Sequence, residues 1–157
     1  MTPAIALLKK LRINHEILKY NHDPTHQSYG MEAVEKLKLE PQSVFKTLMV
    51  ALGSGELCVA ILPVEKMLDL KKFAQIVGEK KAEMADKQVV QKTTGYVLGG
   101  VSPLGQKKRV RTVIDNSAAQ IEKIYVSGGR RGLEIGLHPD DLVHLTEAQF
   151  SDITLKD

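Results

Sequence analysis

The sequence predicts one domain, residues 1–157, of the α/β or α+β class, in which helices pack around a mixed β-sheet. Three observations support this prediction. Helical and strand-like patterns alternate along the chain, two apolar runs flank a glycine-containing turn, and no repeat, low-complexity run or linker interrupts the 157 residues. A chain of this length can bury a sizeable core as a single domain.

The N-terminal part of the chain is predicted to form a helix, a strand and a second helix. Thr2-Pro3 suits the N-cap and first position of a helix, and the apolar stripe that follows predicts this helix over residues 3–12. A strand over 15–20 and a helix over 31–39 follow, and the polar, proline-containing segment 21–29 between them is predicted to be a loop.

The next segment is a predicted β-hairpin, the clearest local pattern in the sequence. Two apolar runs, 44–52 and 56–62, flank the turn Gly53-Ser54-Gly55. Apolar runs joined by a short glycine-containing turn are typical of antiparallel strands.

Two helices are expected after the hairpin. The pattern predicts one over 70–77 that ends at Gly78. It predicts another over 86–94, with Asp86 as the N-cap and Gly95 as the stop.

The C-terminal part of the chain is predicted to be rich in strands. The segment 99–105 contains three glycines and is expected to be a loop. The remaining predicted elements are strands over 110–114, 123–126 and 133–137, a turn over 127–129, and a helix that starts at Pro139 and covers 140–145.

Composition indicates an ordinary globular protein. Hydrophobic residues make up 43% of the chain and charged residues 26%. The single cysteine, Cys58, excludes an internal disulfide and favours a reducing compartment. The sequence has no apolar stretch of about 18 residues and no apolar signal-peptide segment. We therefore expect a cytoplasmic protein that has no membrane partner.

Lys46 breaks the pattern of the first hairpin strand. Side chains alternate between the two faces of a strand, so Lys46 shares a face with Val44, Leu48 and Val50. Near a strand end its ammonium could extend to water. In a cleft, its amine would instead suit a phosphate or a developing oxyanion.

Two glycine-rich segments and one basic cluster are further candidate binding features. The loop 99–105 and the turn 127–129 either make tight connections or let a ligand approach the backbone closely. Lys107, Lys108, Arg109 and Arg111 lie within five residues. They form either a solvated basic turn or a site for the phosphates of a polyanion.

Side chains for metal or nucleophilic chemistry are not clustered in the sequence. His22 and His26 lie in the 21–29 loop without a third ligand nearby, and Cys58 is expected to be a small buried apolar residue. No Gly-x-Ser-x-Gly elbow is present. We therefore expect no metal, no cofactor and no protein nucleophile.

Several short motifs, in order along the chain, resemble the YbaK/EbsC family of trans-editing deacylases that act on Cys-tRNA(Pro). The motifs are Met1-Thr2-Pro3-Ala4, Phe45-Lys46-Thr47-Leu48, Lys92-x-Thr94-Gly95-Tyr96, the segment 99–108, and Tyr125-Val126-Ser127-Gly128-Gly129. The resemblance implies an α/β domain with a curved, mixed, barrel-like sheet and flanking helices, as in the editing insert of bacterial prolyl-tRNA synthetases. It also implies activity on Cys-tRNA(Cys) and a ternary complex with prolyl-tRNA synthetase and the tRNA.

The resemblance also implies roles for individual residues. Lys46 matches the family's essential lysine, which we expect to hold the phosphate of the terminal adenosine. Tyr29 stands where relatives can carry Phe, and Glu134 where they vary between acidic and small residues. The residues that match the substrate pocket are Tyr20, Tyr29, Thr47, Gly99, Gly100, Val101, Ser102, Ser127 and Glu134.

Members of this family are believed to release cysteine by an attack of the substrate's own thiol, which forms a thiolactone. Such a mechanism needs only an orienting pocket and fixed oxyanion donors. The sequence leaves three alternatives open. One is a related deacylase that clears Ala-tRNA(Pro) by water attack, and another is a non-catalytic module that binds tRNA or a synthetase. The third, a structural domain without a ligand, is disfavoured by the 99–105 loop and by Lys46 in a core-like row.

Overall fold

The computed structural model describes residues 1–26 and 28–156. Over these residues the α-helices are α1 (Pro3–Lys10), α2 (Tyr29–Leu37), α3 (Leu70–Ile76), α4 (Lys87–Thr94) and α5 (Pro139–Thr146). Two 3-10 helices cover Pro41–Ser43 and Asn116–Gln120. None of the helices in these two stretches is long and apolar enough to cross a membrane.

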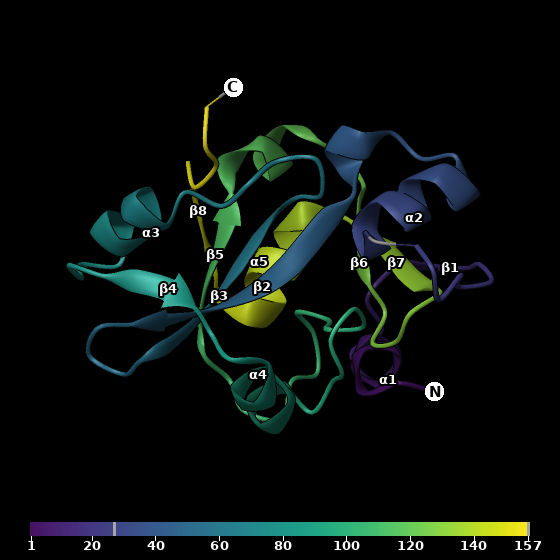
Figure 1. The fold of residues 1–157 in the computed structure, drawn as a ribbon. Coiled ribbons are helices and arrows are strands. Elements are labelled where there is room, and N and C mark those ends of the chain that lie inside the picture. Colours follow the sequence, from purple (N-terminus) through teal and green to yellow (C-terminus); the bar gives the residue numbers. More distant parts are fainter. Residues whose placement is uncertain (27, 157) are drawn as a thin grey trace.

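The β-strands are β1 (Glu16–Lys19), β2 (Phe45–Leu52), β3 (Leu57–Pro63), β4 (Ala82–Met84), β5 (Arg111–Asp115), β6 (Ile124–Ser127), β7 (Leu133–Leu137) and β8 (Gln149–Ser151). Five of them form a mixed sheet in the order β4-β2-β3-β5-β8. The β2–β3 hairpin is antiparallel, whereas β5 runs parallel to β3 and β8 runs parallel to β5. Figure 1 shows this sheet with α3 beside its β4 edge.

The other three strands form an antiparallel sheet in the order β1-β7-β6. One bridge, between Val44 and Tyr125, joins the two sheets immediately before β2 begins. Because this ladder stops after a single residue pair, the strands form two connected sheets and do not close into a barrel. The predicted mixed α/β class is confirmed.

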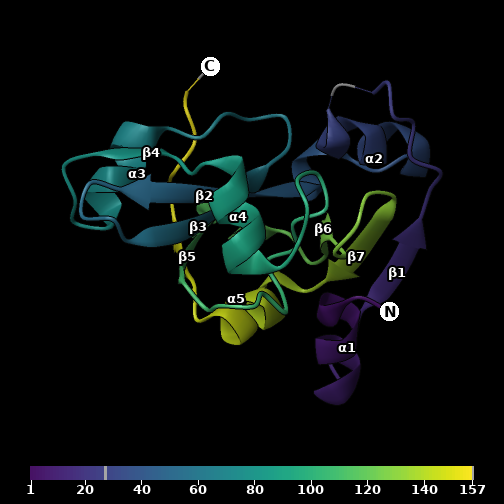
Figure 2. The same cartoon turned by 60° about the horizontal axis from the view of Figure 1, so that its bottom comes forward.

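A shared hydrophobic core holds the two sheets together. It combines Phe45 and Ile61 of the hairpin with Ile135 of β7, and α1, α4 and α5 contribute Leu8, Val90 and Leu142. The opposite face of the five-stranded sheet packs against Phe73 and Val77 of the α3 region. Figure 2 shows α4 in front of β2 and β3, with α1 and α5 toward the bottom of the view.

Every predicted helix and strand is found, within a few residues at each end. Thr2 caps α1 as expected, since its side chain accepts a hydrogen bond from the Ile5 amide. Asp86 holds the N-cap position of α4, but its side chain makes no capping hydrogen bond. The short strands β4 and β8 were not predicted.

Candidate active site

A cavity of about 360 Å³ opens where the start of β2 meets the three-stranded sheet and α2. Its walls come from seven segments of the chain. The lining residues are Tyr20, Ser28, Tyr29, Gly30, Val44, Phe45, Lys46, Thr47, Leu48, Val64, Leu98, Gly99, Val101, Ser127 and Glu134. The cavity thus brings together eight of the ten residues predicted for the pocket.

Lys46 and Thr47 enter the cavity from the start of β2, at the end of the hairpin opposite to its turn, where Lys46 pairs with Leu62. Lys46 is partly buried, and burial lowers the pKa of its ammonium group. Within residues 1–26 and 28–156, no side chain forms an ion pair with it. The buried Thr47 Oγ1 likewise has no hydrogen-bond partner in that part of the chain. Lys46 therefore lines a cavity and presents a free ammonium group to it.

Ser127 and Glu134 enter from the three-stranded sheet, where they face each other across β6 and β7. Leu133, Ile135 and Leu137, the alternate residues of β7, point into the core, so Glu134 projects from the other face. Glu134 is only 8% exposed. Burial raises the pKa of its carboxyl to about 8.

Tyr20 lies beside Glu134, because its amide continues the β1–β7 pairing with a 3.0 Å hydrogen bond to the Gly132 carbonyl. Burial raises the pKa of the Tyr20 hydroxyl to about 12, and the charges of Glu134 and Glu32 act in the same direction. Tyr20 is therefore a neutral hydroxyl at physiological pH.

Arg131 fastens the glycine-rich loop to α2. Its Nε and Nη2 donate hydrogen bonds of 3.0 and 2.7 Å to the Leu98 carbonyl, and its guanidinium lies 4.5 Å from the centre of the Tyr29 ring. A Cβ at Gly99, whose φ is +87°, would stand 2.6 Å from Arg131 Nε and 2.7 Å from the Tyr29 ring. Gly99 thus permits both the turn and the close contact.

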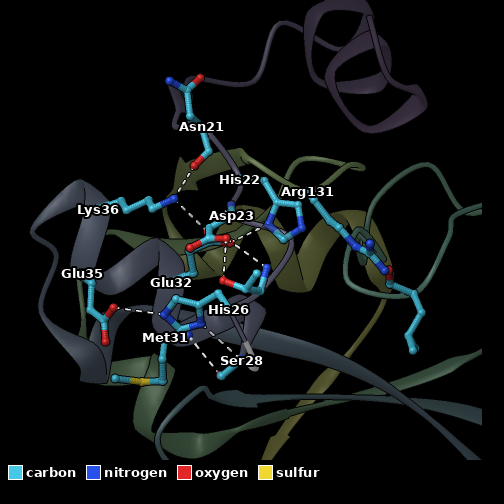
Figure 3. A network of polar contacts seen from close by, with 12 residues as sticks. Asn21, His22, Asp23, His26, Ser28, Met31, Glu32, Glu35, Lys36 and Arg131 are labelled. Carbon is cyan, nitrogen blue, oxygen red and sulfur yellow. Dashed lines mark hydrogen bonds and ion pairs between the residues drawn. The ribbon is translucent and has the colours of Figure 1, made fainter.

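Glu32 of α2, which was not among the predicted site residues, organises the loop beside the cavity. Figure 3 shows its carboxylate at the centre of a polar network: it accepts from Asp23 N at 2.6 Å, contacts His22 Nδ1 at 2.7 Å and pairs with Lys36 Nζ at 2.9 Å. Burial alone would raise the pKa of Glu32, but these contacts hold it at about 2. Its only sequence signal is a glutamate on the core side of an amphipathic helix.

Gly100 and Ser102 do not line the cavity, in contrast to the prediction. Gly100 is packed against the backbone of Arg130, where a Cβ would stand 2.7 Å from the Arg130 Cα. Ser102 is fully buried, and its Oγ accepts a 3.3 Å hydrogen bond from the Leu104 amide. Both residues support the shape of the loop, whereas Gly99 and Val101 face the cavity.

The basic cluster 107–111 lies outside this cavity. Lys107 and Lys108 are exposed. Arg109 donates to the Leu145 carbonyl at 2.8 Å, and Arg111 forms a two-bond ion pair with Glu56 at 2.9 and 3.2 Å. Arg109 borders a different cavity, of about 640 Å³, between α1 and α5.

The histidines and the cysteine make structural contacts. His22 and His26 contact different glutamates, Glu32 and Glu35. Within the described stretches, no three His, Cys, Asp or Glu side chains gather as a metal site would require. Cys58 is fully buried in the core beneath α3, as predicted, and burial raises the pKa of its thiol.

The fold and the cavity define an α/β protein with an open pocket lined by Lys46, which has no ion-pair partner among the described residues, and by the buried acid Glu134. Residues 23–145 match the family described as aminoacyl-tRNA editing domain. The chain is 35% identical, over 99% of its length and 94% of the relative's, to an Enterococcus faecalis protein provisionally named Cys-tRNA(Pro)/Cys-tRNA(Cys) deacylase EbsC.

One further protein is similar in sequence, and one solved structure is similar in fold. The chain is also 28% identical to part of a proline–tRNA ligase from Thermoanaerobacter sp. The aligned region covers 66% of this chain and 18% of the ligase. A solved structure described as a provisional trans-editing enzyme for prolyl-tRNA synthetase has the same fold, with a TM-score of 0.83, 21% identity and 99% coverage of both chains. The chain belongs to the aminoacyl-tRNA editing family, whose members are aminoacyl-tRNA deacylases.

Proposed function

We propose that this chain removes cysteine from Cys-tRNA(Pro), and also from Cys-tRNA(Cys), with the aminoacyl end of the tRNA in the Lys46 cavity. The observation that carries the proposal is the free, partly buried ammonium of Lys46 in a cavity walled by the glycine-rich loop. A cation in this position suits the phosphate of the terminal adenosine. The resemblance to EbsC supports cysteine as the amino acid.

The proposed reaction uses the substrate's own thiol. The thiol loses its proton to water, and the sulfur attacks the carbonyl carbon of the same aminoacyl group. A C–S bond forms, the ester C–O bond breaks, and the tRNA 3′ oxygen takes up a proton as the thiolactone leaves. The protein supplies a folded substrate geometry and fixed donors for the oxyanion. No histidine or cysteine lines the cavity in the described part of the chain, so the proposal assigns the nucleophile to the substrate.

We further propose that Lys107 and Lys108 bind phosphates of the tRNA body. Both are exposed on the segment that follows the glycine-rich loop. Arg109 and Arg111 lie beside them, but their contacts with Leu145, Glu147 and Glu56 leave them less free to meet a ligand. The similarity to part of a proline–tRNA ligase supports a ternary complex with prolyl-tRNA synthetase, which would identify the tRNA.

The proposal is tested by the release of amino acid from three substrates, Cys-tRNA(Pro), S-methyl-Cys-tRNA(Pro) and Ala-tRNA(Pro). Fast release of cysteine alone is expected, because only the first substrate carries a free thiol. Rapid release of S-methylcysteine would exclude the thiol mechanism. Preferential release of alanine would favour the related Ala-tRNA(Pro) deacylase. Absence of release from all three, even with prolyl-tRNA synthetase present, would favour a non-catalytic binding module.

A further inference from the structure

Glu134 is a buried acid without a partner in the cavity. Among the described lining residues it is the only acid and Lys46 is the only base. Glu134 is 8% exposed, and no hydrogen bond or ion pair connects its carboxyl to any part of the chain that the structure describes. The cavity thus contains two groups of opposite charge type, and they are not paired with each other.

A second buried glutamate shows that this fold can satisfy a carboxylate where no ligand is needed. Glu32 is completely buried and has contacts from Asp23 N, His22 and Lys36. Both glutamates lie close enough to Tyr20 to act on its hydroxyl. Buried polar groups in folded proteins are nearly always hydrogen-bonded. The Glu134 carboxyl has no partner among the described residues and faces the cavity, so it is free to meet a group of a ligand.

The chemistry of an aminoacyl ester indicates which ligand group would pair with the Glu134 carboxyl. The 3′ end of an aminoacyl-tRNA carries phosphates, which are anionic, and one cation, the α-ammonium group of the amino acid. Resting on the proposed function, we propose that Glu134 binds the α-ammonium group, while Lys46 takes the phosphate. The amino acid would then be held at its amine, and the ester carbonyl would lie between Glu134 and Lys46, near Thr47 and Ser127.

The protonation of Glu134 is compatible with this role. With a pKa of about 8, its carboxyl is mostly protonated in the empty cavity at neutral pH. The α-amino group of a free chain end titrates at about 7.7–8.0. An amine with this pKa is mostly in the ammonium form at neutral pH, so its binding displaces the Glu134 proton to solvent and leaves an ion pair inside the cavity.

The test compares Cys-tRNA(Pro) with N-acetyl-Cys-tRNA(Pro), which keeps the thiol and the ester but lacks the cation. For the wild type we expect kcat/KM to be roughly tenfold to hundredfold higher with the free amine, as for a charge-assisted hydrogen bond. Glu134→Gln should lose most of this preference by slowing only the free-amine substrate. Glu134→Asp, which keeps the carboxylate, should retain part of it. Glu83→Gln, on the exposed edge strand β4, is the matched control and should behave as the wild type.

The results separate this inference from the proposed function. Equal release of both substrates by the wild type would overturn the role of Glu134 and leave the deacylase proposal intact. An equal loss on both substrates in Glu134→Gln would also overturn it, because that pattern indicates a purely structural role. Release of neither substrate by the wild type would refute the proposed function and this inference together. If Glu134→Gln does not fold, equal release of both substrates by the wild type still overturns the inference, and Glu134→Asp tests whether the preference depends on the position of this carboxylate.

Discussion

Glu32 and Glu134 are both buried, and their surroundings give them opposite protonation behaviour. Three contacts hold the pKa of Glu32 at about 2, whereas burial without a partner raises that of Glu134 to about 8. Glu32 is therefore a fixed anion that positions the loop carrying His22 and Asp23. Glu134 remains available to a ligand.

Glu32→Gln should lower the free energy of unfolding at pH 7 by about 2 kcal/mol, since it removes a buried carboxylate whose hydrogen-bond partners His22 and Lys36 are partly exposed. The folded-state pKa of Glu32 lies below its ordinary value of 4.5. Its charge thus stabilises the protein above pH 4.5, and this contribution is lost as the pH falls toward 2. Urea unfolding of both proteins between pH 7 and pH 2.5 should show the difference shrinking through this window. A difference that is independent of pH would contradict the assignment.

Lys46 could be singled out from the sequence, but its neighbours in the cavity could not be found by pattern alone. A lysine in an apolar strand row departs from the expected alternation, and it does line a cavity. Glu134 alternates normally between Leu133 and Ile135, which predicts an exposed face. It is buried because α2 and the loops cover that face, and no local pattern encodes this cover. Only the family resemblance pointed to it.

At the scale of elements, the glycine-rich loop depends on its attachment to α2 through Arg131 and Tyr29. Both contacts crowd Gly99, and Gly99 also has a left-handed backbone conformation. Gly55, in the hairpin turn, has a similar φ of +94° but lies in open space. A side chain at Gly55 would add backbone strain alone, whereas a side chain at Gly99 would add the same strain and also disturb the contacts of Arg131 and Tyr29.

Gly55→Ala should cost about 1 kcal/mol of stability, from the left-handed conformation alone, and leave deacylation unchanged. Gly99→Ala should cost more, because its Cβ would displace Arg131 and Tyr29, and it should reduce kcat/KM at least several-fold. Thermal unfolding and cysteine release from Cys-tRNA(Pro) measure the two effects. Equal activity of the two variants would show that the attachment does not matter for the reaction.

Local patterns predict most elements here because each carries its own signal. The β2–β3 hairpin has two apolar runs and a glycine turn, and Thr2-Pro3 marks the start of α1. The strands β4 and β8 have three residues each and exist only because β2 and β5 offer open edges for pairing. Such pairing depends on the tertiary structure, so neither strand could be predicted from its own sequence.

At the scale of the whole molecule, the cavity lies at the junction of the two sheets. The Val44–Tyr125 bridge places the start of β2, with Lys46, beside β6 and β7, which carry Ser127 and Glu134. The shared core of the two sheets fixes this geometry. The contact between the two sheets could not be predicted from the sequence, because a single pair of bridged residues leaves no repeating pattern along the chain.

The proposed contact with the tRNA body predicts a salt-dependent defect. The double charge reversal Lys107→Glu/Lys108→Glu should raise KM for Cys-tRNA(Pro), while kcat stays near the wild-type value. The slope of log KM against log salt concentration should fall by the amount expected for the loss of roughly two phosphate contacts. Lys71→Glu/Lys80→Glu, at two exposed lysines that line a different cavity, is the control. A similar rise of KM in both double variants would point to a general effect of net charge.

The most direct test of the account is the rate of cysteine release from Cys-tRNA(Pro) by the wild type, Lys46→Ala and Lys71→Ala. We predict fast release by the wild type and by Lys71→Ala, and loss of at least a hundredfold in kcat/KM for Lys46→Ala. Stability should be unchanged in Lys46→Ala, because Lys46 forms no ion pair within the described residues. Undiminished release by a folded Lys46→Ala protein would contradict the placement of the active site in this cavity.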